Sequence, residues 1–302
     1  TPYNGGQRGE DLLREYIEQA RVISVIGLCK NAGKTTVLNQ LIGELDDVVL
    51  GLTSVGRDGE DTDLVTGTGK PAIHVRAGTL FATAKGMLPL CPVTVEVLAV
   101  TDVMTPLGSV GLFRALSDGA VQLAGPSSVA QLEPLSQLFC SFGAEKVLID
   151  GAAGRKSLAS AGGCAILCTG ASLDGAMESV VAETQHVCSL FAASTVPNPD
   201  ARRIEGGITT ESLRKLTQRG EAGPIAVPNA THILADRAST ELFYRSGGSF
   251  ILEKNLPIAA VCANSFSAYG RHFEPEAFLT ALRQALTVPV VDVRTEKAGA
   301  DQ

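Results

Sequence analysis

The segment 27–36, Gly-Leu-Cys-Lys-Asn-Ala-Gly-Lys-Thr-Thr, constrains the fold more than any other part of the sequence. It follows the apolar run 22–26, which predicts a buried strand, and it leads into 37–45, where apolar residues recur with helical spacing. A glycine turn between a strand and a helix can bind phosphate, because its N–H groups and the positive end of the helix dipole point at the anion. The pattern therefore predicts a phosphate-binding loop.

Each part of this loop has an expected role. Gly33 lets main-chain N–H groups close around phosphate oxygens, Lys34 adds a mobile cation, and Thr35 offers a hydroxyl to Mg²⁺. The expected nucleotide-binding set is completed by Gly27, Lys30, Asn31, Ala32 and Thr36. We therefore expect a site for Mg²⁺ and a nucleoside triphosphate. The alternative is a chance Gly-Lys-Thr at the start of a helix.

The order of elements predicts an α/β fold of the P-loop NTPase type, with a mainly parallel sheet flanked by helices. Residues 48–53 form a second apolar run, and a β-α-β unit of this length requires parallel strands. We expect a nucleotide-binding domain over 1–196 and a smaller α/β region over 197–302. Residues at about 64–125 carry β-rich runs and are expected to form a small appendage that holds a substrate or a partner.

Two polar, glycine-rich segments follow predicted strands. In segment 54–61, Asp58 is expected to place the nucleophilic water or to sense the γ-phosphate, unless the segment is only a solvated turn. Asp150 ends the predicted strand 146–150 and is expected to orient Mg²⁺ through water. Beyond it, Arg155 and Lys156 suit a phosphate or an acidic substrate group, or else form a solvated basic turn.

Three further residues have a functional and a structural interpretation or a predicted environment. Asn264 ends an apolar strand, where it either contacts a base or substrate or belongs to a turn. His74 is expected to be a packed or surface histidine. His186 lies opposite the apolar face of the helix predicted after Leu173 and is expected to face solvent. A lead-in helix is expected over 10–20, because its apolar residues share one helical face.

Composition excludes several classes of function. The net charge of −7 argues against a nucleic-acid partner, which requires a basic footprint. No apolar run is long enough to span a membrane and the N-terminus lacks a signal-peptide core, so we expect a cytoplasmic location. The seven cysteines form no Cys-x-x-Cys pair, which favours reduced, packed thiols over a metal or disulfide role. Cys29 is the exception, because a thiol exposed in the phosphate loop is open to oxidation.

Several segments occur together with the phosphate loop. They are Leu-Thr-Ser-Val-Gly-Arg-Asp-Gly-Glu at 52–60, Lys-Pro at 70–71, Gly-Thr-Leu at 78–80 with Ala-Thr-Ala at 82–84, and Asp-Gly-Ala at 150–152 with Arg-Lys-Ser at 155–157. In this combination the chain resembles the P-loop subunit of the reactivase for adenosylcobalamin-dependent lysine aminomutases. The resemblance implies an ATP-dependent factor that works with a companion reactivase subunit to restore an aminomutase carrying damaged cobalamin. It also implies ATP rather than GTP, and a role connected with lysine degradation.

A more distant resemblance is to dethiobiotin synthetases, which also have five residues between the loop glycines, here Gly27 and Gly33. Asp150 stands where those ligases usually place Glu, and the strand ending at Thr53 lacks their Lys-Pro. Three classes of function therefore stay open: a P-loop ATPase that changes shape on hydrolysis, an ATP-dependent ligase or kinase for a small molecule, and a nucleotide-gated adaptor without significant hydrolysis. Lys34, Asp58 and Asp150 are the expected catalytic residues, and a homo-oligomer is possible.

Overall fold

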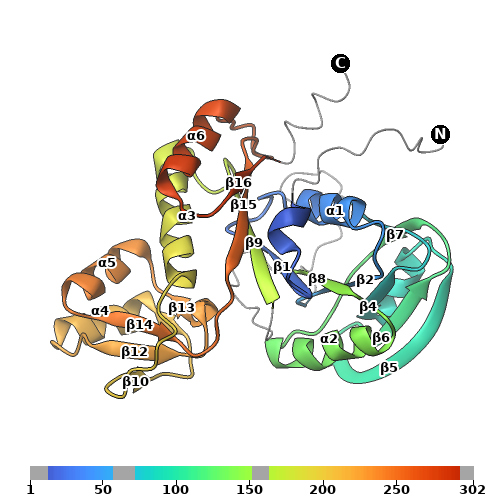
Figure 1. The fold of residues 1–302 in the computed structure, drawn as a ribbon, viewed down its shortest axis with the longest axis horizontal. Helices are drawn as coiled ribbons and strands as arrows, with labels where there is room; N and C mark the ends of the chain where they lie inside the picture. Colours follow the sequence, from blue (N-terminus) through green and yellow to red (C-terminus); the bar gives the residue numbers. More distant parts are fainter. Residues whose placement is uncertain (1–12, 57–71, 152–162, 293–302) are drawn as a thin grey trace.

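A nine-stranded sheet is the centre of the molecule. The computed structural model describes residues 13–56, 72–151 and 163–292 (Figure 1). The strand order is β16-β15-β9-β1-β8-β2-β4-β6-β5. Its strands are β1 (Val22–Gly27), β2 (Leu50–Ser54), β4 (Leu80–Ala84), β5 (Val95–Thr105), β6 (Gly108–Ala115), β8 (Lys146–Asp150), β9 (Gly163–Gly170), β15 (Ile258–Asn264) and β16 (Val290–Val291).

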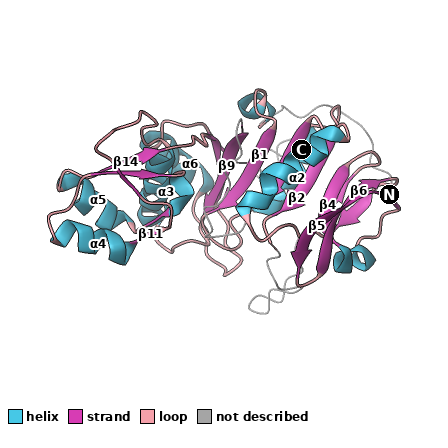
Figure 2. Ribbon diagram, turned by 90° about the horizontal axis from the view of Figure 1, so that it is seen from below, coloured by secondary structure: helices cyan, strands magenta, loops and turns pink. Residues whose placement is uncertain are grey.

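Every neighbouring pair from β16 through β4 is parallel, and only the β4–β6 and β6–β5 pairs are antiparallel. β1 and β2 are buried along their whole length and β9 at every residue after Gly163, as expected for a sheet covered on both faces. In Figure 2 the strands of this sheet lie side by side. The predicted α/β class with a mostly parallel sheet is confirmed.

Helices cover the two faces of the sheet. The α-helices are α1 (Lys34–Glu44), α2 (Leu132–Ser141), α3 (Met177–Phe191), α4 (Thr210–Gln218), α5 (Arg237–Arg245) and α6 (Pro275–Ala285). The 3-10 helices are η1 (Arg14–Ile17), η2 (Lys85–Leu90), η3 (Val129–Gln131) and η4 (Ala230–His232). On β1, Ile23 and Val25 belong to the apolar cluster of α1, whereas Val22 and Ile26 belong to the cluster of α2, α3 and α6. Successive residues therefore point to opposite helical layers.

Residues 72–125 are sheet-rich, as predicted, but they are not a separate appendage. β4 pairs in parallel with β2, and β6 and β5 continue the large sheet beyond it. Only the two-stranded ribbon of β3 (Ile73–Val75) and β7 (Gly119–Val121) lies outside the sheet. The reason is that β4 is buried along its whole length. A strand that is buried on both faces is stabilised most when it pairs with an existing sheet that helices already cover. Its Leu-Phe-Ala-Thr-Ala sequence shows no clear alternation of apolar and polar residues, so the sequence did not predict this strand.

The C-terminal part contains a smaller lobe that holds α4 and α5 (Figures 1 and 2). Its strands are β10 (Arg202–Arg203), β12 (Pro224–Val227) and β14 (Ser249–Leu252) in one parallel sheet, and β11 (Ile208–Thr209) with β13 (Ile233–Leu234) in another. After the lobe the chain returns to the large sheet as β15, α6 and β16. The predicted boundary at 197 stays a prediction, but β15, which follows residue 257, pairs with β9 of the preceding part, and β16 pairs with β15.

The expectation for His186 is wrong. This side chain is only 6% exposed, and its Nε2 atom lies 3.4 Å from the carbonyl oxygen of Ala235. Ala235 belongs to the lobe, which packs over the face of α3 that was expected to meet solvent. The periodicity of one helix shows its most apolar face but does not show that a second element covers another face.

The lead-in helix expected over 10–20 is a single 3-10 turn, η1, within the residues that the structure describes; residues 10–12 lie outside them. The turn is fixed by contacts with distant elements. The carboxylate of Glu44 accepts hydrogen bonds from the N–H groups of Leu13 and Arg14, both at 2.9 Å. Tertiary hydrogen bonds therefore stabilise a segment too short to persist as an isolated helix.

Candidate nucleotide site at the carboxyl end of the sheet

The phosphate loop predicted from the sequence connects β1 to α1. Leu28 donates its N–H to the carbonyl oxygen of Cys168 on β9 at 3.0 Å, and the chain then turns away from the sheet. Asn31 and Gly33 have left-handed backbone conformations, with φ angles of 60° and 98°. Gly33 is the N-cap of α1 and brings no side chain to its first turn. The N–H groups that begin α1 are thus placed as in helix termini that bind anions.

Lys34 folds back over the end of β1. A Cβ atom added to Gly27 would lie 3.1 Å from both Cγ and Cδ of Lys34, and 3.2 Å from the carbonyl oxygen of Cys29. The absence of a side chain at Gly27 is therefore what allows the lysine stem to cross it. This contact fits the lysine to a phosphate held in the same loop.

Asp150 lies at the same edge of the sheet as the loop. It is in register with Val25 of β1 on one side and Ser54 of β2 on the other. The N–H of the following residue, Gly151, donates to the carbonyl oxygen of Val25 at 2.9 Å. The carboxyl ends of parallel strands carry the ligand sites of open α/β sheets, so the predicted position of Asp150 is confirmed, and its role stays a prediction.

The structure brings the predicted loop residues and Asp150 to one edge. The loop residues are Gly27, Lys30, Asn31, Ala32, Gly33, Lys34, Thr35 and Thr36. Asp58, Arg155 and Lys156 lie outside the described residues. Within 13–56, 72–151 and 163–292, no group of three or more His, Cys, Asp or Glu side chains is arranged to hold a metal ion. Mg²⁺ at phosphate sites uses one or two protein ligands, and the hydroxyl of Thr35 and the carboxylate of Asp150 are of the right chemical type.

Two residues from distant strands contact the loop. Asn264, at the end of β15, donates its Nδ2 hydrogen to the carbonyl oxygen of Asn31 at 3.2 Å. Ser172, after β9, places its Oγ 3.5 Å from the same carbonyl oxygen and 3.2 Å from the Oγ of Ser267. The sequence predicted a base or substrate contact, or a turn, at Asn264. It gave no signal for Ser172, because one serine after a strand has no distinguishing pattern.

Cys29 is half-buried in the loop, and its thiol is less reactive than the sequence indicated. Burial, offset only in part by the nearby charge of Lys34, raises the pKa of Cys29 to about 11. The thiolate is the nucleophilic form, so a raised pKa slows oxidation and alkylation at neutral pH.

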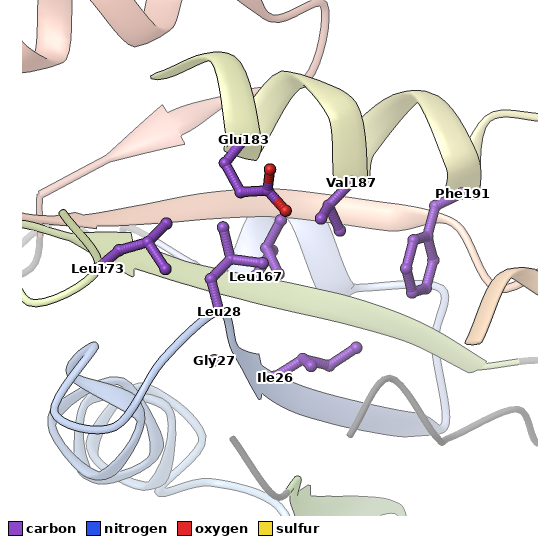
Figure 3. A pocket seen from close by; sticks show the side chains of 8 residues that line it. All are labelled: Ile26, Gly27, Leu28, Leu167, Leu173, Glu183, Val187 and Phe191. Carbon is purple, nitrogen blue, oxygen red and sulfur yellow. The ribbon is translucent and has the colours of Figure 1, made fainter. Parts of the chain in front are cut away.

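A small pocket lies against the start of the loop, on the α3 side of the sheet (Figure 3). Its volume is about 60 Å³. The residues that line it are Ile26, Gly27, Leu28, Leu167, Leu173, Glu183, Val187 and Phe191. Glu183 of α3 is the single charged group among these residues, and Figure 3 shows its carboxylate directed toward Leu167 and Leu28. At this volume the pocket is too small for a nucleoside, and it meets the loop only at Gly27 and Leu28.

No protein-family model, no curated protein and no solved structure matches this chain. Among the described residues, no helix combines the length and the apolar character that crossing a membrane would require.

Proposed function

We propose that the chain is an Mg²⁺-dependent ATP-binding and ATP-hydrolysing protein whose nucleotide site is the loop between β1 and α1. The observation that carries the proposal is the loop itself. A left-handed Gly33 begins α1 at the carboxyl end of a central parallel strand, and the stem of Lys34 lies across Gly27. Backbone N–H groups, a helix N-terminus and a lysine at one place form a site for a polyphosphate.

The residues present fit a nucleoside triphosphate with Mg²⁺. The cradle between Gly27 and Lys34 would be filled by any Cβ at position 27. In the proposed complex the loop N–H groups and the Lys34 ammonium bind phosphate oxygens, the Thr35 hydroxyl binds the metal ion, and Asp150 accepts a hydrogen bond from a metal-bound water. Mg²⁺ neutralises charge on the phosphates when it is bound. Asp58 is proposed to place the attacking water.

The partner in the proposal rests on the sequence resemblance alone. We propose that hydrolysis supports the reactivation of an adenosylcobalamin-dependent lysine-type or ornithine-type aminomutase, together with a companion reactivase subunit, in the cytoplasm. A γ-phosphate that orders one loop and releases it on hydrolysis is a general way to couple turnover to a protein partner. The preference for ATP over GTP has the same basis, since the chain contains no Asn-Lys-x-Asp motif.

The test is calorimetric binding of Mg-ATP followed by phosphate release, with wild type and Lys34→Ala. Loss of the lysine removes the charge that faces the phosphates, so we expect at least about a tenfold loss of affinity, the equivalent of about 1.4 kcal/mol. Lys254→Ala, a change to a lysine of the lobe, is the control and should bind as wild type does. Equal affinity and rate in Lys34→Ala would show that the site is elsewhere.

Phosphate release then separates the classes of function. A reactivation factor should turn over slowly alone and several-fold faster with an aminomutase and the companion subunit. A rate that responds to a small-molecule pool and not to these proteins would identify a ligase or kinase. Tight binding of Mg-ATP with no release under any condition would identify a nucleotide-gated adaptor.

A further inference from the structure

The backbone of Asn31 is the strained point of the phosphate loop. Among the described residues it is the one non-glycine residue with a positive φ, at 60°. Residues other than glycine adopt this conformation at a steric cost, although asparagine tolerates it better than most residues. Such a conformation persists where the surrounding structure fixes it, so the contacts of Asn31 decide the shape of the loop.

Asn264 makes the most direct of these contacts. Its Nδ2 atom donates to the Asn31 carbonyl oxygen at 3.2 Å, while its Oδ1 atom accepts the N–H of Phe266, also at 3.2 Å. The two bonds fix the orientation of the amide, because a flipped amide would direct its NH₂ group at the Phe266 N–H. The Nδ2 and Cβ atoms of Asn264 also lie 3.6 and 3.7 Å from the position that a Cβ of Gly33 would occupy.

The large sheet in turn fixes Asn264. It is 6% exposed and pairs with Gly170 on β9, and its carbonyl oxygen accepts the N–H of Ala171 at 3.0 Å. A Cβ on Gly170 would overlap the backbone oxygen of Asn264, so a residue without a side chain is required there. Ser172 then approaches the Asn31 carbonyl from the β9 side, although its single hydroxyl hydrogen can serve only one acceptor at a time.

We propose that Asn264, supported by Ser172, is a positioning residue. It keeps the backbone of Asn31 in its left-handed conformation and so pre-organises the loop N–H groups for the phosphates. This inference rests on the proposed nucleotide site and adds to it a determinant from the C-terminal end of the chain. It assigns Asn264 to the loop and not to the base of the nucleotide. Pre-organised donors cost no reorganisation when the anion binds, so their loss weakens binding of any polyphosphate.

The test measures the affinity of Asn264→Ala for two probes, Mg-ATP and Mg-tripolyphosphate, by calorimetry. Tripolyphosphate has no base, so the proposed positioning role of Asn264 predicts that both affinities fall by a similar factor, about tenfold. Asn264→Asp should lose at least as much, because it places an oxygen against the Asn31 carbonyl oxygen. Asn198→Ala, which changes an exposed asparagine in the turn after α3, is the matched control and should bind both probes as wild type does.

Hydrogen exchange of the ligand-free protein gives a second readout. The positioning role predicts faster exchange of the amides of 28–36 in Asn264→Ala, with unchanged exchange in α2, which packs against β2 and β8 rather than β15. Ser172→Ala should have the same pattern with a smaller loss of affinity, about twofold, and it replaces Asn264→Ala in every comparison if that variant does not fold.

Three results would overturn the inference. A loss confined to Mg-ATP would make Asn264 a base contact. Unchanged affinity for both probes in Asn264→Ala and Asn264→Asp would remove its positioning role. If wild type binds neither probe, the proposed function fails, but the positioning role of Asn264 is still tested by hydrogen exchange. Unchanged exchange of 28–36 in Asn264→Ala would overturn that role.

Discussion

At the scale of single residues, the candidate site depends on backbone shape more than on charged groups. Gly27 has no side chain, and this allows the Lys34 stem to cross the end of β1. Asn31 and Gly33 take left-handed conformations, and a carbonyl oxygen of the loop is anchored from β15. The thiol of Cys29 is a weak nucleophile at neutral pH, because burial raises its pKa to about 11. A nucleotide would therefore meet a loop whose geometry is set before binding.

Gly27→Ala should separate geometry from stability. The added Cβ would lie 3.1 Å from the Lys34 stem, so the lysine must move by a few tenths of an ångström while the buried strand stays in place. We expect Mg-ATP affinity to fall about tenfold and the free energy of unfolding to change by less than about 1.5 kcal/mol, by calorimetry and urea denaturation.

The control for this change is Gly43→Ala in α1, where the new Cβ would meet no atom within 4 Å. It should raise the free energy of unfolding by about 0.5–1 kcal/mol, because alanine is the better helix former, and leave Mg-ATP binding unchanged. Full affinity in Gly27→Ala would mean that the lysine does not need the space above position 27.

At the scale of elements, hydrogen bonds from side chains fix segments whose own propensity is weak. η1 is the clearest case, because its end is held by Lys146 at the start of β8. The Lys146 ammonium donates to the carbonyl oxygens of Ile17 at 3.1 Å, Glu18 at 2.9 Å and Ala20 at 2.9 Å. Burial of the ammonium lowers the pKa of Lys146. One cation thus binds three carbonyl oxygens at and just beyond the end of η1, where backbone carbonyls lose their helical partners.

Lys146→Met should therefore destabilise the protein although it keeps most of the apolar stem. We expect the free energy of unfolding to fall by about 1–2 kcal/mol, because three carbonyl oxygens lose a charged donor while water still reaches some of them. Chemical denaturation measures the change. Lys215→Met in α4, which removes an exposed pair with Glu211, is the control and should cost less than about 0.5 kcal/mol. Equal effects of the two changes would mean that the η1 contacts contribute nothing specific.

At the scale of the whole molecule, the chain leaves the large sheet and returns to it. β9 pairs with β1 on one side and with β15 on the other, although β9 and β15 are separated in sequence by α3 and the whole lobe. The apolar cluster that includes Val180 and Val187 of α3 continues into the lobe through Leu213 and Phe243. The lobe and the sheet therefore share one core.

A chain that ends at residue 196 tests this arrangement and the predicted domain boundary together. It would lack β15, β16 and α6, and the long edge of β9 would be bare, so we expect insoluble or aggregated protein. The measurement is the soluble yield and the elution volume in gel filtration beside the full chain. A soluble, monomeric 1–196 with cooperative unfolding would show that the boundary is real and that β15 is dispensable.

Local patterns were sufficient for the parts of the fold that consist of one strand or one helix. The strands β1 and β8, the helix α1 and the loop before it agree with their predictions, because each has an uninterrupted apolar run, a helical period or a glycine turn of its own. The parallel arrangement of the sheet follows from the β-α-β unit around the loop. These features depend on neighbours in sequence, so local patterns were enough to predict them.

The other features depend on contacts between segments that are distant in sequence. The strands β4 and β6 were missed and His186 was misplaced, because burial by another element leaves no period in the segment that is buried. Ser172 and Asn264 meet Asn31 across separations of 141 and 233 residues. Only the order of β1, β9 and β15 in the sheet brings these side chains to the phosphate loop. The loop was therefore determined by local sequence, and the residues that position it were determined by strand pairing.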